Sequence, residues 1–173
     1  MKRWLAVLPL VGLFALGVLA ASQLLAPEKP GFDEADARPA PTNIFPLLNS
    51  EGGIQFAPPP GGKAIAVNLF ASWCGPCEAE HPLITDLAER HPDQVYGLAY
   101  KDREADTLSF LTNLGNPYTR IGVDADGQGG LEFGLTGVPE TFIIDGSGNI
   151  VWHVRGALDT AAVEKIGELL SEN

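Results

Sequence analysis

The sequence has little cysteine and little positive charge. Its 173 residues include two cysteines and three histidines, and its 11 lysines and arginines stand against 22 aspartates and glutamates. Two cysteines cannot form the disulfide network of a small secreted scaffold, and a chain of this length can bury a core without one. The formal net charge of −11 argues against a nucleic acid partner, because phosphates attract basic surfaces. The sequence therefore predicts one globular domain, with no internal repeat.

The first residues have the pattern of an export signal. Lys2 and Arg3 precede an uncharged run of 22 residues, 5–26. At ~1.5 Å per residue, a helix of that length crosses the ~30 Å hydrocarbon core, whereas a cleaved signal peptide has an apolar region of only ~7–15 residues. We predict a signal-anchor transmembrane helix over 1–26, and cleavage after Ala20 is the alternative. The positive start should stay in the cytoplasm, which places the rest on the periplasmic side of the inner membrane.

Residues 27–43 are rich in proline and acid and are expected to be a linker, so the folded domain is predicted over 44–173. The apolar patterns predict a small hairpin turning at 49–53, strands over 64–70, 95–100, 141–145 and 150–155, and helices over 75–90, 105–114 and from Asp159 onwards. Alternating strands and helices followed by a hairpin indicate an α/β fold, with a mixed sheet and helices on both faces.

The two cysteines, Cys74 and Cys77, stand where a buried strand is expected to end and a helix to begin. A structural zinc site normally takes four ligands, and the histidines, which we expect at the surface, show no suitable constellation. A disulfide that closes so short a loop stabilises a fold very little. The positive end of the helix favours a thiolate on the first cysteine. We predict a redox-active disulfide in which Cys74 attacks and Cys77 resolves, without a metal or an organic cofactor.

The residues around the cysteines resemble the thioredoxin superfamily. The matching features are Trp73-Cys74-Gly75-Pro76-Cys77, the helix-kinking Pro82, and the cis-proline loop at Gly137-Val138-Pro139. Four further motifs are similar to the DsbE-type, membrane-anchored thiol:disulfide interchange proteins of cytochrome c maturation: AEHP at 79–82, VYGLAYKDR at 95–103, LGNPY at 114–118 and GVPETFIID at 137–145.

This resemblance implies a thioredoxin-like fold and a substrate-binding surface beside the cysteines. The positions that match the family's motifs there are Trp73, Gly75, Pro76, Val138, Pro139 and Glu140. The bond before Pro139 is expected to be cis, and its loop should offer unpaired backbone groups to the substrate. Trp73 has packing as its alternative role, and Glu140 has that of an exposed charge. Lys101 and Asp102 are expected to be structural.

One position departs from ordinary thioredoxins. Asn68 stands six residues before Cys74, where those proteins place a buried aspartate that helps to move protons. An amide cannot act as a base. Glu80, about one helical turn after Cys77, is the nearest replacement, and the DsbE type resembles this arrangement. We predict that Glu80 is catalytic, and its alternative is a solvated helix residue.

The charges near the cysteines favour a reductant. Strong oxidants stabilise their thiolate form, whereas nearby negative charge makes a thiolate costlier. Glu78 and Glu80 flank the pair in sequence, and Glu140 is expected to join them across the proline loop. Together with the resemblance, this predicts a reductant of apocytochrome c, or of a protein disulfide linked to it, that a membrane thiol electron donor reduces again.

Two other functions stay open at this point. One is a general periplasmic thioredoxin-like reductase. The other is a non-catalytic chaperone that binds apocytochrome. A monomer is the expected state.

Overall fold

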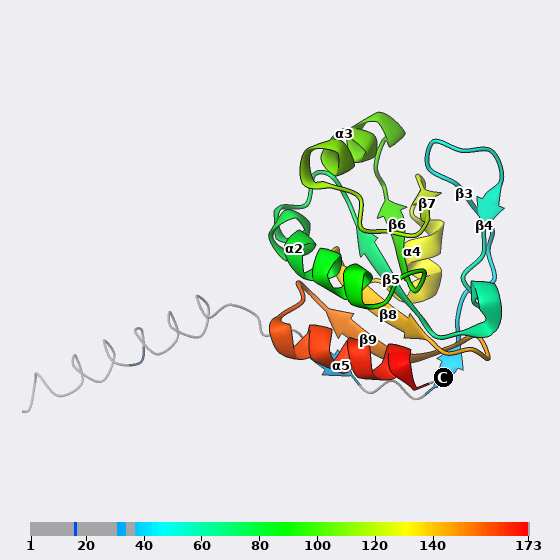
Figure 1. The fold of residues 1–173 in the computed structure, drawn as a ribbon. Coiled ribbons are helices and arrows are strands. Elements are labelled where there is room, and N and C mark those ends of the chain that lie inside the picture. The colour runs from blue at the N-terminus through cyan, green and yellow to red at the C-terminus, as the bar shows by residue number, and fades with distance from the viewer. Residues whose placement is uncertain (1–15, 17–30, 34–36, 173) are drawn as a thin grey trace, which may run out of the picture.

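The computed structural model describes residue 16, residues 31–33 and residues 37–172. Seven strands form one twisted sheet in the order β1-β9-β8-β5-β6-β7, with β2 also paired to β9 (Figure 1). The strands of this sheet are β1 (Gly31–Asp33), β2 (Arg38–Pro39), β5 (Ile65–Phe70), β6 (Val95–Tyr100), β7 (Ile121–Asp124), β8 (Glu140–Ile144) and β9 (Asn149–Arg155). The β5–β6 and β6–β7 pairs are parallel and the others are antiparallel, so the predicted mixed sheet is confirmed.

Helices cover both faces of this sheet, as predicted. They are α2 (Gly75–Arg90), α3 (Glu104–Leu114), α4 (Gln128–Phe133) and α5 (Thr160–Ser171), with a short 3₁₀ turn, η1, at Pro60–Gly62. α2 and α5 lie side by side across the front of the sheet in Figure 1. Side chains of α2, α3 and α5 belong to one core cluster, whereas Phe133 of α4 belongs to the other.

Strand alternation decides which side chains lie on which face. All six residues of β5 are buried, as its continuous apolar sequence predicts. Ala66 packs in the cluster that contains the cysteines, and Val67 and Leu69 pack in the opposite cluster. Phe142 is fully buried on that opposite face, and burying such a side chain contributes ~1.5–3 kcal/mol. Successive strand residues therefore separate two environments, which matters for the polar residues described below.

The predicted small hairpin is present as β3 (Phe45–Pro46) and β4 (Gly53–Ile54). It packs on β7, where the absence of a side chain on Gly122 makes the contact possible. A Cβ atom at that position would lie 2.9 Å from the Cβ atom of Phe45. Neither β7 nor α4 was predicted from the sequence. Two adjacent glycines, Gly129 and Gly130, weaken the helical pattern of α4.

The domain begins earlier than residue 44. Within the expected linker of 27–43, β1 and β2 both pair with β9, and Ala40 donates its backbone N–H to the carbonyl of Gly148 at 3.0 Å. This part of the linker is therefore an edge of the sheet. The expected anchor, 1–26, lies outside the described residues except for Leu16. In the part of the chain that the structure describes, no helix has the length and apolar character of a membrane span.

Candidate active site

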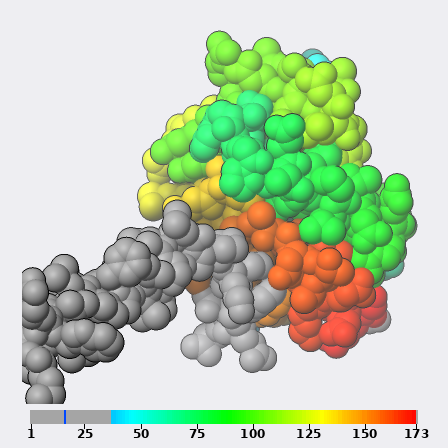
Figure 2. All heavy atoms as spheres, turned by 90° about the vertical axis from the view of Figure 1, so that its left-hand side faces the viewer, coloured from blue at the N-terminus to red at the C-terminus, as the bar shows by residue number. Residues whose placement is uncertain are grey.

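A disulfide joins Cys74 and Cys77 at the start of α2. Cys74 is the N-cap of the helix, and the backbone N–H of Cys77 donates to its Sγ at 3.2 Å. Gly75 and Pro76 form the exposed first turn between them. Figure 2 views this side of the molecule, where the turquoise atoms of the segment leading into α2 reach the surface above the orange β9–α5 connection.

The two sulfur-bearing residues differ little in exposure. Cys74 is 5% exposed and Cys77 is 3% exposed, so the disulfide form shields both. In this state, exposure therefore does not distinguish the predicted attacking thiol, Cys74, from the predicted resolving thiol, Cys77. The two cysteines differ in their position on the helix: Cys74 is the N-cap of α2, where the positive end of the helix lies, and Cys77 lies within the first turn.

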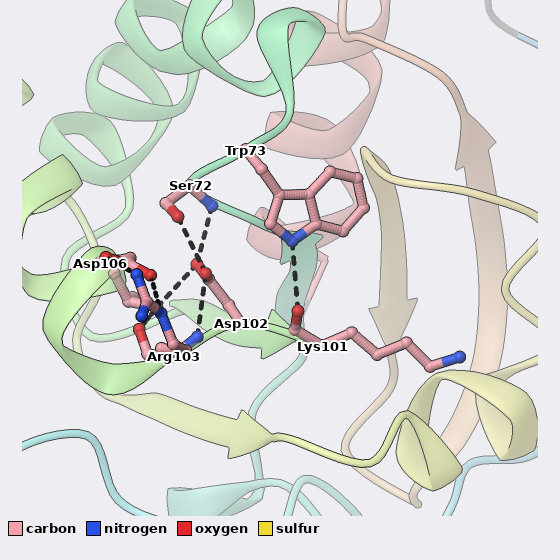
Figure 3. A network of polar contacts seen from close by, with 7 residues as sticks. Ser72, Trp73, Lys101, Asp102, Arg103 and Asp106 are labelled. Carbon is pink, nitrogen blue, oxygen red and sulfur yellow. Dashed lines mark hydrogen bonds and ion pairs between the residues drawn. The ribbon is translucent and has the colours of Figure 1, made fainter.

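Trp73, directly before Cys74, is exposed, and a hydrogen bond to the backbone holds its side chain. The residue is 60% exposed, and its indole N–H donates to the carbonyl of Lys101 at 3.2 Å (Figure 3). Exposure of so large an apolar side chain favours the role in shaping a partner surface over the role in packing.

The loop that carries Trp73 is held by Asp102, which follows β6. One carboxylate oxygen of Asp102 accepts from the backbone N–H of Ser72 at 2.7 Å and the other from its hydroxyl at 2.8 Å (Figure 3). The hydroxyl of Thr107 donates to the same carboxylate at 2.8 Å. Asp102 therefore has the structural role that was expected, because it ties the active-site loop to α3.

The predicted cis bond between Val138 and Pro139 is present. In the β5–β8 register, Leu69 is paired with Glu140, so the residues after β5 and those before β8 leave the sheet at the same end. The cysteine loop and the Pro139 loop therefore lie at the same end of these two neighbouring strands. Val138 is half-buried and contacts both core clusters, whereas Gly137 before it is exposed.

Glu80 is buried, so the alternative of a solvated helix residue is wrong. The residue is 2% exposed. One carboxylate oxygen accepts from the side-chain amide of Asn68 at 2.9 Å, and the other accepts from the backbone N–H of Leu158 at 2.8 Å. Burial raises the pKa of Glu80 to about 7, although both hydrogen bonds act in the opposite direction. Glu80 is three positions after Cys77 on α2, which places both on one face of the helix.

Asn68 extends this polar group to a residue that the sequence analysis did not single out. The hydroxyl of Tyr118 donates to the amide oxygen of Asn68 at 2.8 Å, and the amide nitrogen also donates to Thr141 at 3.1 Å. Tyr118 is buried, and burial together with the charge of Glu80 raises its pKa well above the usual value. Its hydroxyl therefore stays a hydrogen-bond donor at neutral pH. The motif LGNPY contains it, but only the fold brings it to Asn68.

Glu140 lies on the other face of the sheet from Glu80. Its neighbour Thr141 reaches Asn68, whereas Glu140 is hydrogen-bonded to His153 at 2.7 Å, and His153 stacks on Phe142. Glu140 is 1% exposed, so it is not an exposed charge, and its carboxylate does not join Glu78 and Glu80 around the disulfide. The expectation that Glu140 joins the other two carboxylates beside the cysteines is therefore wrong.

The expectation of surface histidines is wrong for two of the three. His153 and His81 are each 4% exposed, whereas His91 is half-buried. His81 is hydrogen-bonded to the carbonyl of Gly115 at 3.1 Å, and burial lowers its pKa despite this bond. Among the described residues, no three His, Cys, Asp or Glu side chains gather as a metal site.

Comparisons with known proteins agree on one kind of protein. The pattern of the Redoxin family matches residues 39–170. The thiol:disulfide interchange protein HelX of Rhodobacter capsulatus is 38% identical over 133 residues, which cover 76% of this chain and 75% of HelX. The thiol:disulfide interchange protein DsbE of Xylella fastidiosa is 36% identical over 128 residues, which cover 73% of this chain and 64% of that protein, a little under two thirds.

Solved structures give the same fold. A thiol:disulfide interchange protein of the thioredoxin family from Chlorobium tepidum superposes with a TM-score of 0.65 at 24% identity, covering 80% of this chain and 99% of that one. The predicted thioredoxin-like fold is confirmed. With its disulfide at the start of α2, the chain is a thiol:disulfide oxidoreductase.

Proposed function

We propose that this chain, which belongs to the DsbE-type thiol:disulfide interchange proteins of the Redoxin family, is an exported, membrane-tethered reductant of apocytochrome c disulfides. The catalytic domain would lie on the periplasmic side of the inner membrane, and a membrane thiol donor would return electrons to it. The uncharged N-terminal run and the relatives in this family support that proposal.

The surroundings of Glu80 support the proposal that the protein reduces its substrate. Its carboxylate is buried, about one helical turn after Cys77 on α2, and both hydrogen-bond donors to it, Asn68 and the N–H of Leu158, are uncharged. A negative charge near the cysteines makes a thiolate costlier. Because oxidants of this kind rely on a stabilised reduced form, the site favours giving electrons to a substrate.

The exchange proceeds in two steps. The Cys74 thiolate attacks one sulfur of the substrate disulfide, so a mixed disulfide forms and the other substrate sulfur leaves as a thiolate that takes up a proton. Cys77 then gives its proton to Glu80 and attacks Cys74, which releases the second substrate thiol. The substrate gains two electrons and two protons, and the protein becomes the disulfide that the structure contains.

The pKa of Glu80 suits this proton transfer. A carboxylate with a pKa of about 7 is ionised in half the molecules at neutral pH, so it can take a proton from a thiol and release it afterwards. Asn68 cannot take the proton, but it holds the carboxylate in place. No metal or organic cofactor is needed for these steps.

A substrate panel tests the proposal. An oxidised peptide with the Cys-X-X-Cys-His sequence of apocytochrome c should be reduced with a kcat/KM at least about tenfold above that for insulin, because binding at the proline loop adds to simple exchange. Equal values would favour a general periplasmic reductase. Full maturation of cytochrome c by a variant with both cysteines changed to alanine would favour a non-catalytic chaperone and overturn the proposal.

A further inference from the structure

Glu140 and His153 form a buried polar pair that the thiol exchange does not use. Glu140 is the first residue of β8, next to Pro139, and His153 lies on the neighbouring strand β9, paired with Phe142 of β8. They are 1% and 4% exposed. Burial of a carboxylate is costly unless donors satisfy it, so the partners of Glu140 indicate what the side chain does.

Those partners lie on both sides of the carboxylate. On one side, His153 Nε2 is 2.7 Å from Oε2. On the other side, Oε1 accepts from the backbone N–H of Thr136 at 3.0 Å, from the hydroxyl of Thr136, and from the backbone N–H of Gly137 at 3.3 Å. The carboxylate thus connects an inner strand of the sheet to the segment directly before Pro139.

The ring of His153 is itself fixed. It stacks on Phe142 with ring centroids 4.0 Å apart and an angle of 16° between the planes. Burial on its own would raise the pKa of Glu140, but the hydrogen bonds from His153 and Thr136 outweigh it and hold the pKa below the usual value. The carboxylate therefore stays ionised at neutral pH, as charge-assisted hydrogen bonds to the loop require.

We propose that His153, acting through Glu140, is a positioning residue that holds the Thr136–Pro139 segment in the backbone conformation that receives the substrate polypeptide. Thr136 and Gly137 are exposed, and without the carboxylate their N–H groups would bond to water and the segment would sample several conformations. Because the segment is already ordered in the free protein, less conformational entropy is lost when a substrate strand pairs with it. This inference rests on one part of the proposed function, namely that the substrate polypeptide binds to the Thr136–Pro139 segment.

The test compares two substrates that depend differently on this segment. An oxidised peptide disulfide must lie along the Pro139 loop, whereas 5,5′-dithiobis(2-nitrobenzoic acid) needs access to Cys74 alone. His153→Leu removes the donor to Glu140 and should raise the KM for the peptide about tenfold with little change in kcat. The loss in kcat/KM should be at least about five times larger for the peptide than for the small disulfide. His153→Gln should recover most of the loss, because its amide N–H can replace the Nε2–H donor.

A matched control is His91→Leu, which changes a histidine at the end of α2, away from this segment. Equal losses for both substrates in His153→Leu would mean a general structural role and would overturn the inference, as would no loss for either. If His153→Leu fails to fold, Thr136→Val decides, because it removes only the hydroxyl donor to Glu140 Oε1 and should raise the peptide KM a few fold. An unchanged KM for the peptide in Thr136→Val would also contradict the proposal.

Failure of the proposed function would give a different result: the wild type would reduce the Cys-X-X-Cys-His peptide and insulin with equal kcat/KM.

Discussion

Replacing Glu80 by glutamine should slow the resolution of the mixed disulfide by tens of fold near pH 7. The thiol of Cys77 must lose a proton in that step, and an ordinary thiol with a pKa of ~8.5 ionises poorly at neutral pH. Glu80 is buried on the same face of α2 and has a pKa of about 7, so it is the base that the structure offers. Single-turnover mixing of a preformed mixed disulfide measures this step directly.

The pH dependence separates a lost base from a damaged site. Above the thiol's own pKa of ~8.5, water and hydroxide can remove the proton, so the rates of variant and wild type should converge there. Glu78→Gln is the matched control, because it makes the same substitution at an exposed position of the same helix. Equal slowing in both variants, or a constant ratio at every pH, would contradict the role of Glu80 as a base.

Stability provides a second measurement on the same variants. The pKa of Glu80 rises from 4.5 to about 7 on folding, so the folded form holds its proton more tightly than the unfolded form. Ionisation of Glu80 should therefore lower the unfolding free energy of the wild type by about 3 kcal/mol as the pH rises from 4.5 through 7, and Glu80→Gln should lack this contribution. The glutamine lacks one hydrogen bond, since Asn68 and the N–H of Leu158 are both donors, but that cost is the same at every pH.

The disulfide between Cys74 and Cys77 should have a reduction potential more negative than about −200 mV, nearer to the about −270 mV of thioredoxin than to the about −120 mV of a strong oxidant. The reason is the buried carboxylate of Glu80 on the same helix face as Cys77, which raises the free energy of a nearby thiolate formed in the reduced state. Glu80→Gln should make the potential less negative by about 30 mV, which for two electrons corresponds to about 1.4 kcal/mol. Equilibration with glutathione buffers at pH 7 gives both values, and a wild-type potential near −120 mV would rule out a reductant.

The parts of this site that the sequence predicted are local in the chain. The Trp73–Cys77 motif at the end of an apolar run specifies the strand, the helix start and the dithiol, and Glu80 follows on the same helix. Short-range periodicity is enough for such features. The 3.6-residue period of a helix fixes which residues share a face, whatever the rest of the chain does.

The missed parts depend on contacts between distant segments. Tyr118 is 50 residues from Asn68, and Leu158 is 78 residues from Glu80, so no pattern within one segment could pair them. Glu140 was misplaced for a different reason. Adjacent strand residues point to opposite faces, so the register of β8 against β5 puts Thr141 beside Asn68 and turns Glu140 away.

The early edge strands were missed because their sequence argues against them. The segment around Arg38 and Pro39 is rich in proline and acid and has no apolar alternation, which is typical of a linker. Its backbone nevertheless pairs with β9 at the edge of the sheet, where proline is tolerated.

Trapping the natural partner tests the proposed function most directly. Cys77→Ala in the full-length protein leaves Cys74 able to attack a substrate but unable to be released, so the mixed disulfide should accumulate. Acid quenching would preserve the mixed disulfide while it is isolated from carbonate-washed membranes. Mass spectrometry would then identify the partner, and the double variant Cys74→Ala, Cys77→Ala serves as control. We expect the washed membranes to retain the protein and its main adduct to be apocytochrome c or a thiol protein that handles apocytochrome c. A broad set of unrelated exported proteins, or a complex found only in the soluble fraction, would contradict it.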